Sequence, residues 1–81
     1  KSAEGSYAIA QVNLGKMYEL GRGVLPDAIQ AYKWYTLAVA DVSIQETRDR
    51  VIERRDELAQ KMSQQEIAEA NRLAREWTPT R

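Results

Sequence analysis

Apolar residues recur along this chain at three- and four-residue spacing, which is the pattern of amphipathic helices. Four stretches show it, at about residues 7–20, 28–41, 44–62 and 64–77. Alternation of apolar and polar residues around a tight turn, the signal of a β-hairpin, does not occur. The sequence therefore predicts an all-α protein built from four helices.

The first two predicted helices each carry one apolar stripe and are joined by a glycine-rich turn. Gly21 and Gly23 supply the left-handed backbone conformation that ends a helix, and Asp27 is expected to cap the next one. The stripe of the first helix is Ala8, Gln11, Leu14, Gly15 and Tyr18, and that of the second is Ala28, Ala31, Tyr35 and Ala38.

The last two helices have start and stop signals of their own. Ser43 is a candidate N-cap for the third helix, and Ser63 with Glu66 matches the capping box that opens the fourth. Pro79 is expected to end that helix. Their stripes are Ile44, Val51, Ile52, Leu58, Ala59 and Met62 in the third helix, and Ile67, Ala70, Leu73, Ala74 and Trp77 in the fourth.

The third helix also carries a dense run of charges of both signs. Glu46 with Arg50 and Glu57 with Lys61 stand four residues apart, in the order that favours ion pairs on a helix. Mixed runs of this kind are typical of a solvated helix face. We interpret this side as exposed, with a partner site as the alternative.

Composition narrows the classes of function. The 81 residues suffice for one domain or for one end of a larger protein, and twelve basic residues balance twelve acidic ones. This balance creates no overall field for nucleic acid or anionic lipid, so no nucleic-acid partner is expected. No apolar run is long enough for membrane insertion. The absence of cysteine slightly favours the cytoplasm, and a periplasmic or secreted location stays open if a signal peptide has been removed.

The sequence lacks the usual patterns of catalysis and of metal binding. Without cysteine and histidine, the chain has neither the common zinc ligands nor the usual general base near neutral pH. Gly21 and Gly23 follow a helix rather than a strand and lack the third glycine of a dinucleotide-binding loop. We therefore expect no catalysis by this chain, no cofactor and no metal ion.

Many residues of the first helix pair follow one motif in order. The positions are Ala8, Ala10, Gln11, Leu14, Gly15, Met17, Tyr18, Gly21, Gly23, Val24, Asp27, Ala31, Trp34, Tyr35 and Ala38. This series resembles one full Sel1-like repeat, a helix–turn–helix relative of the tetratricopeptide repeat. The stretches 55–63 and 67–77 are similar, less specifically, to the closing helix pair of bacterial members of that family.

The resemblance implies an α-α solenoid, in which two antiparallel helix pairs stack as a short right-handed superhelix. Residues 1–7 would be the tail of a preceding repeat or disordered, and residues 8–43 the Sel1-like repeat. Residues 44–78 would form a degenerate C-terminal pair that caps the stack, and residues 79–81 a disordered tail. In such repeats the consensus residues are buried between helices. Trp34 and Trp77 both lie on helical stripes, so they are interpreted as packing residues rather than as an aromatic site.

The same resemblance implies a partner-binding surface on the inner side of the stack, where repeat proteins present their variable residues. The candidates are Ile9, Val12, Lys16 and Glu19 on the first helix, and Glu53, Asp56 and Gln60 on the third. As the alternative, Ile9 and Val12 pack on a preceding repeat and the charged candidates only face solvent.

Two functions are compatible with these features. The resemblance implies a scaffold or adaptor module that binds a protein or peptide, mostly in bacteria. The alternative is structural, as the C-terminal cap of a larger repeat protein or as a self-association module. Apolar surface left uncovered at the end of the stack would then make the fragment a homodimer.

Overall fold

The computed structural model describes residues 2–42 and 44–77, and they form four helices. These are α1 (Ser2–Leu20), α2 (Ala28–Asp41), α3 (Gln45–Ala59) and α4 (Gln64–Glu76). No strand occurs in this described part, so the all-α helical-repeat fold is confirmed. Helix α1 begins at Ser2, ahead of the expected start near Tyr7. The sequence did not indicate this earlier start, because the first turns of the helix contain no periodic apolar residues.

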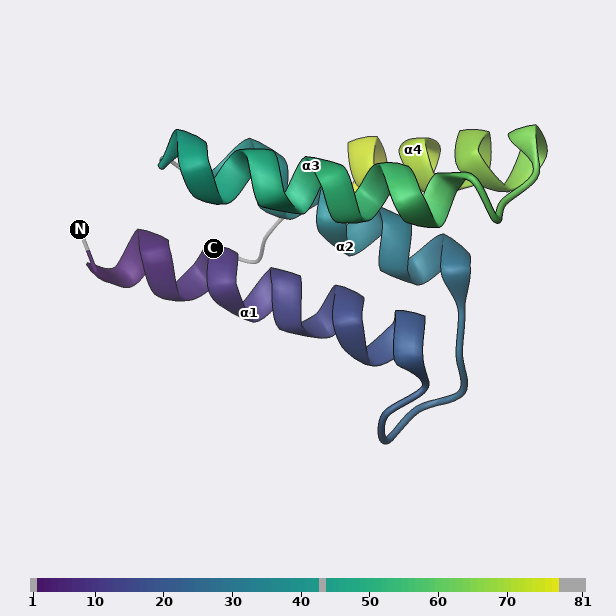
Figure 1. The fold of residues 1–81 in the computed structure, drawn as a ribbon, viewed down its shortest axis with the longest axis horizontal. Helices are drawn as coiled ribbons and strands as arrows, with labels where there is room; N and C mark the ends of the chain where they lie inside the picture. The colour runs from purple at the N-terminus through teal and green to yellow at the C-terminus, as the bar shows by residue number, and fades with distance from the viewer. Residues whose placement is uncertain (1, 43, 78–81) are drawn as a thin grey trace.

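The helices form two layers (Figure 1). Helices α1 and α3 lie in front and run in the same direction, while α2 and α4 lie behind them and run back. Helix α2 packs closely against each of the other three helices. Its buried residues are Ala31, Tyr32, Tyr35 and Ala38, and the alanines allow neighbouring backbones to approach. The core is therefore centred on α2.

The turn between α1 and α2 has the predicted glycine geometry. Gly21 and Gly23 have φ angles of 71° and 75°, in the left-handed region that favours glycine. The backbone N–H of Asp27 donates to the carbonyl of Tyr18 at 2.9 Å, which closes the loop. The side chain of Asp27 then accepts from the backbone N–H of Gln30 at 3.2 Å, so the predicted N-cap is confirmed.

The capping box of α4 is also confirmed. The Ser63 hydroxyl accepts from the backbone N–H of Glu66 at 3.1 Å, and the Glu66 carboxylate accepts from the backbone N–H of Ser63 at 2.9 Å. At the start of α3, Ile44 occupies the N-cap position and makes no capping hydrogen bond with its side chain. The predicted roles of Ser43 and Pro79 fall on residues outside the described part.

One of the two predicted ion pairs on α3 is wrong. Arg50 and Glu46 lie 3.7 Å apart, and both side chains are largely exposed. Glu57 and Lys61 make no ion pair, because α3 ends at Ala59 and the four-residue spacing no longer places their side chains one turn apart.

The closest approach in the core joins α1 to α2. Tyr35 is fully buried, and its ring lies against the backbone of Gly15. A Cβ atom at position 15 would come within 2.6 Å of the Tyr35 Cε1 atom, closer than real Cβ atoms approach a ring carbon. Glycine is therefore needed at this position to admit the ring.

The two tryptophans meet where α2 passes the end of α4. The rings of Trp34 and Trp77 are 5.7 Å apart between centroids and inclined by 71°, an edge-to-face arrangement. The Lys33 ammonium lies 4.5 Å from the centroid of the Trp34 ring, and burial lowers the pKa of Lys33. Both rings are half-buried, in agreement with the packing role expected of them.

We expect the substitution Gly15→Ala to lower the free energy of unfolding by about 1–2 kcal/mol. Alanine is intrinsically better than glycine in a helix by about 1 kcal/mol, but a methyl group only 2.6 Å from the Tyr35 ring should cost about 2–3 kcal/mol, the upper part of the range for overpacking. Urea denaturation would measure the balance. Asn13→Ala, at an exposed position of the same helix, is the control and should leave stability unchanged or slightly raised. A Gly15→Ala protein as stable as the parent would contradict the tight contact.

Candidate partner-binding groove

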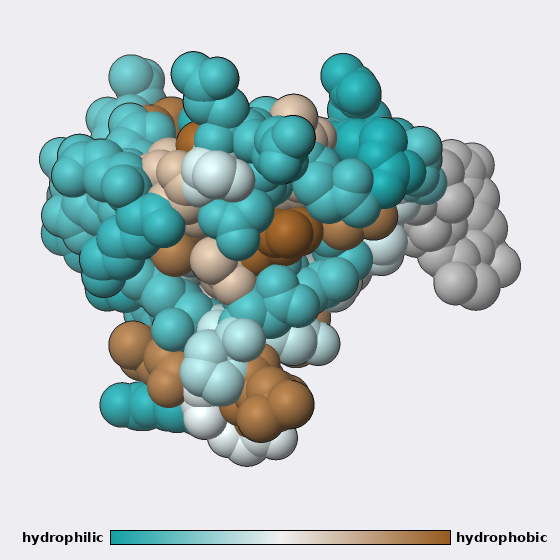
Figure 2. All heavy atoms as spheres, turned by 90° about the vertical axis from the view of Figure 1, so that its right-hand side faces the viewer, coloured by the Kyte–Doolittle hydropathy of each residue, from teal (hydrophilic) through white to brown (hydrophobic). Residues whose placement is uncertain are grey.

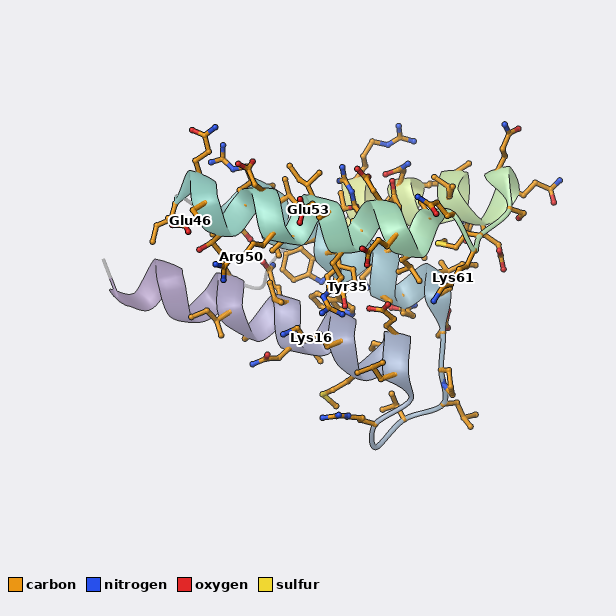
Figure 3. All side chains as sticks on the ribbon, viewed as in Figure 1. Lys16, Tyr35, Glu46, Arg50, Glu53 and Lys61 are labelled. Atoms are coloured by element: carbon orange, nitrogen blue, oxygen red, sulfur yellow. The ribbon has the colours of Figure 1, made fainter. Side chains whose placement is uncertain are left out.

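A groove open to solvent runs between α1 and α3. Its volume is about 600 Å³. The α1 wall consists of Ala8, Ile9, Val12, Asn13 and Lys16, and the opposite wall consists of Val42, Ile44, Thr47, Arg50, Val51, Glu53, Arg54 and Glu57. In Figure 3, Lys16 on α1 and Arg50 on α3 lie on facing sides of this groove.

The α1 wall follows from the way this helix packs on α2. Ala8, Gln11 and Gly15 are buried, and they share one face because they stand three and four residues apart. The residues one position further along, Ile9 and Lys16, therefore turn away from that face. Ile9 is 60 % exposed although it is a large apolar residue.

The α3 wall is set by the buried stripe of that helix. Val51 and Leu58 are buried against the core. Successive residues of a helix are rotated by about 100° about its axis. Arg50, Arg54 and Glu57 therefore lie beside this stripe, all on the same side of it. These side chains form the groove wall above α1.

Four of the seven candidate residues expected from the sequence meet in this groove. They are Ile9, Val12, Lys16 and Glu53. Asp56 and Gln60 are exposed and do not line it. Their expected position came from aligning α3 with α1, and of the three aligned positions only that of Glu53 lines the groove.

Glu19, the remaining candidate, lies below the groove and is already engaged. The Tyr35 hydroxyl donates to its Oε1 atom at 2.7 Å, and an Arg54 N–H group donates to the same atom at 3.5 Å. The Glu19 side chain is only 16 % exposed. One carboxylate thus ties together α1, α2 and α3, a role that the sequence did not suggest.

The hydroxyl of Tyr35 is held in its neutral form. Burial is the larger cause and the hydrogen bond to the Glu19 carboxylate the next, and together they raise the pKa of Tyr35 well above its ordinary value of 10.0. Both causes disfavour a phenolate at this position. The Tyr35 hydroxyl therefore keeps the proton that it donates to Glu19 at pH values above its ordinary pKa.

The groove continues into a second hollow toward the C-terminal end of α1. This hollow has a volume of about 390 Å³. It is lined by Asn13, Lys16, Met17, Leu20, Arg22 and Arg54, three of which also line the first hollow. No carboxylate is among these lining residues, so the groove has a basic end.

The remaining arginines of α3 are less exposed than the charge pattern suggested. An Arg48 N–H group donates to the backbone carbonyl of Val42 at 2.9 Å. The Arg55 guanidinium lies 5.5 Å from the centroid of the Tyr32 ring. Long side chains of this kind bury their stems while keeping the charge near water. The solvated-face interpretation therefore holds for Arg50 but not for these two residues.

The described residues contain no group of three or more acidic side chains placed to hold a metal ion. Among residues 2–42 and 44–77, no helix combines the length and the apolar character needed to cross a membrane.

Comparison with known families now adds to this geometry. The model described as the Sel1 repeat matches residues 8–41. The chain carries a Sel1 repeat. Helix α1, the glycine turn and α2 form this Sel1 repeat, and α3 and α4 lie outside the match. No curated protein and no solved structure gives a match. Sel1 repeats are in general protein–protein interaction modules, and here the Sel1 repeat supplies the α1 wall of the groove.

We expect the stability of the Sel1 repeat to fall as pH rises above about 10, in part because of Tyr35. The unfolded phenol ionises near its ordinary pKa of 10.0, whereas the folded phenol has a raised pKa and stays protonated. The unfolded state therefore releases a proton that the folded state keeps, and alkali favours unfolding. Tyr35→Phe should cost about 1–3 kcal/mol at pH 8, because it removes a hydrogen bond to a charged group.

Urea denaturation of both proteins from about pH 8 to pH 11 would test this expectation. The stability difference between the parent and Tyr35→Phe should shrink above about pH 10, while other titrations cancel in the comparison. A difference that stays constant over this range would contradict the raised pKa.

Proposed function

We propose that this chain is a non-catalytic interaction module that binds an extended segment of a partner protein in the groove between α1 and α3. The observation that carries the proposal is the pair of exposed isoleucines at the groove. Ile9 on α1 is 60 % exposed and Ile44 at the start of α3 is 63 % exposed, and both line the same hollow. Exposed apolar residues gathered in a concave site are typical of a surface that a partner covers.

The length of the groove favours an extended segment. Along α1 the lining residues run from Ala8 to Leu20, which corresponds to about 18 Å at 1.5 Å per residue. About five residues of an extended chain cover that distance. A compact small molecule would contact only part of the groove, whereas a peptide would contact both of its hollows.

The scaffold beneath the groove supports binding without rearrangement. The Glu19 carboxylate contacts Arg54 from α3 and Tyr35 from α2, so both walls are fixed to the same buried centre. A site that is already formed loses less entropy on binding than one that must be ordered. The groove candidates Val12, Lys16 and Glu53, and an adaptor role in a bacterial protein, are parts of the same proposal.

The proposal predicts that Ile9→Ser together with Ile44→Ser weakens peptide binding strongly without unfolding the protein. Phage-displayed random peptides of about twelve residues would be selected on the parent protein, and the affinities of the selected peptides measured by fluorescence anisotropy. Removing two apolar contacts of this size should weaken binding about tenfold or more. Both isoleucines are largely exposed, so helical content and thermal stability should change little.

Leu25→Ser is the matched control, because Leu25 is 86 % exposed in the α1–α2 loop and does not line the groove. It should leave the affinities unchanged. The proposal is wrong if no peptide is selected, or if every selected peptide binds the double variant as tightly as the parent. Light scattering on the same samples would show whether a second copy of the chain competes for the groove.

A structural role as the end of a helical stack is the second candidate function, and the outer face of α4 favours it. Arg72 forms ion pairs with Glu69 and Glu76 on this exposed face. Terminal elements of repeat proteins need a polar outer face of this kind. The Arg72 guanidinium also donates hydrogen bonds to the Glu69 carboxylate, and these lower the pKa of Glu69.

The cap role predicts that α4 does not self-associate. Light scattering should give the mass of a monomer, independent of concentration, for both the parent and the Ile9→Ser, Ile44→Ser variant. A mass that rises with concentration in both proteins would mean that a surface other than the groove self-associates. The polar face of α4 would then not be closing the stack.

A further inference from the structure

The basic end of the groove carries apolar and positively charged side chains side by side. Lys16, Arg22 and Arg54 surround the second hollow, and Met17 and Leu20 provide its apolar surface. The other hollow has exposed apolar residues at Ile9 and Ile44, and its α3 wall carries charges of both signs, from Arg50, Glu53, Arg54 and Glu57. From this division we infer that the partner segment is an acidic peptide with one apolar anchor, and that its carboxylates bind at Lys16, Arg22 and Arg54. This inference rests on the proposed function and specifies its partner.

The cations at this end of the groove can form further ion pairs and hydrogen bonds. Among the residues that the structure describes, neither Lys16 nor Arg22 makes an ion pair or a side-chain hydrogen bond. Arg54 has one contact, at 3.5 Å to Glu19, and its side chain is 43 % exposed. A guanidinium has five N–H donors, so Arg54 can hold Glu19 and also bind a carboxylate from above.

Apolar surface beside the cations argues for a peptide rather than a nucleic acid. Leu20 is 54 % exposed, and Figure 2 shows apolar surface gathered near the α1–α2 loop, below a largely hydrophilic face. The whole chain has no net charge, and none of the described residues that line the groove is an aromatic residue on which a base could stack. Three cations next to aliphatic side chains are complementary to a segment that combines carboxylates with an aliphatic residue.

The spacing of the two ends defines the peptide further. Lys16 follows Ile9 by about 10 Å along α1, and Leu20 follows it by about 16 Å. An extended chain covers these distances in about three to five residues. The acidic residues of the partner should therefore stand about three to five positions from its apolar anchor.

The selected phage peptides provide the test, because the library contains acidic, basic and neutral sequences alike. We expect the groove-binding peptides to carry Asp or Glu at that distance from Leu, Ile, Val or Phe. Their affinity should fall as salt rises from about 0.05 M to about 0.5 M, since exposed charges are screened. The variant Lys16→Glu with Arg22→Glu should bind them about tenfold or more weakly.

A charge-matched control separates this site from an overall charge effect. Lys61→Glu with Arg75→Glu makes the same change in net charge at exposed positions that do not line the groove, and it should bind the peptides like the parent. Arg54 is left intact in all variants because it contacts Glu19.

The outcomes distinguish the two proposals. Peptides that need Ile9 and Ile44 but lack acidic residues, or that bind the Lys16→Glu, Arg22→Glu variant as tightly as the parent, would overturn the acidic-partner inference and leave the groove function standing. Equal weakening by the two charge variants would also overturn the inference. If no peptide depends on Ile9 and Ile44, both proposals are wrong.

Discussion

The ring of Tyr35 occupies the space that a side chain at position 15 would need, and this contact sets how closely α1 approaches α2. The ring then reaches past Gly15, so that its hydroxyl meets Glu19 one turn further along α1. From Glu19 the contact passes to Arg54 on α3. One buried aromatic residue and one carboxylate thereby position three helices. The same contacts fix the positions of both groove walls.

Helix α2 takes the central position because it offers two kinds of surface. Its alanines let neighbouring backbones come close, and its tyrosines fill the volume that remains. Helix α1 packs mainly on α2, so the side of α1 that faces away from α2 keeps an exposed isoleucine and forms one wall of the groove to α3. The groove is thus a consequence of packing both front helices on α2 rather than on each other.

Most of the fold could be predicted from the sequence because local signals specify it. Glycines with left-handed backbone, the Asp27 cap and the Ser63 capping box all depend on residues within a few positions of each other, and all were found where expected. The α1 wall of the groove was also predicted, since the Sel1 repeat fixes which face of α1 is buried. Which residues of α3 face α1 depends on packing between distant segments, which local signals do not specify. Asp56 and Gln60 were therefore placed on the groove side, and the role of Arg54 was missed. The residues flanking the buried Val51 stripe would have indicated the correct face.

The edge-to-face pair of Trp34 and Trp77 has a consequence for anyone who studies this protein in solution. They are the only tryptophans of the chain, and they touch each other. Intrinsic tryptophan fluorescence therefore reports on a single place, where α2 meets the end of α4. It does not report on the side of α1 that faces away from α2. Loosening of α1 would leave the emission unchanged while circular dichroism registered lost helix. Agreement between the two signals is thus a direct measure of whether the four helices unfold as one cooperative unit.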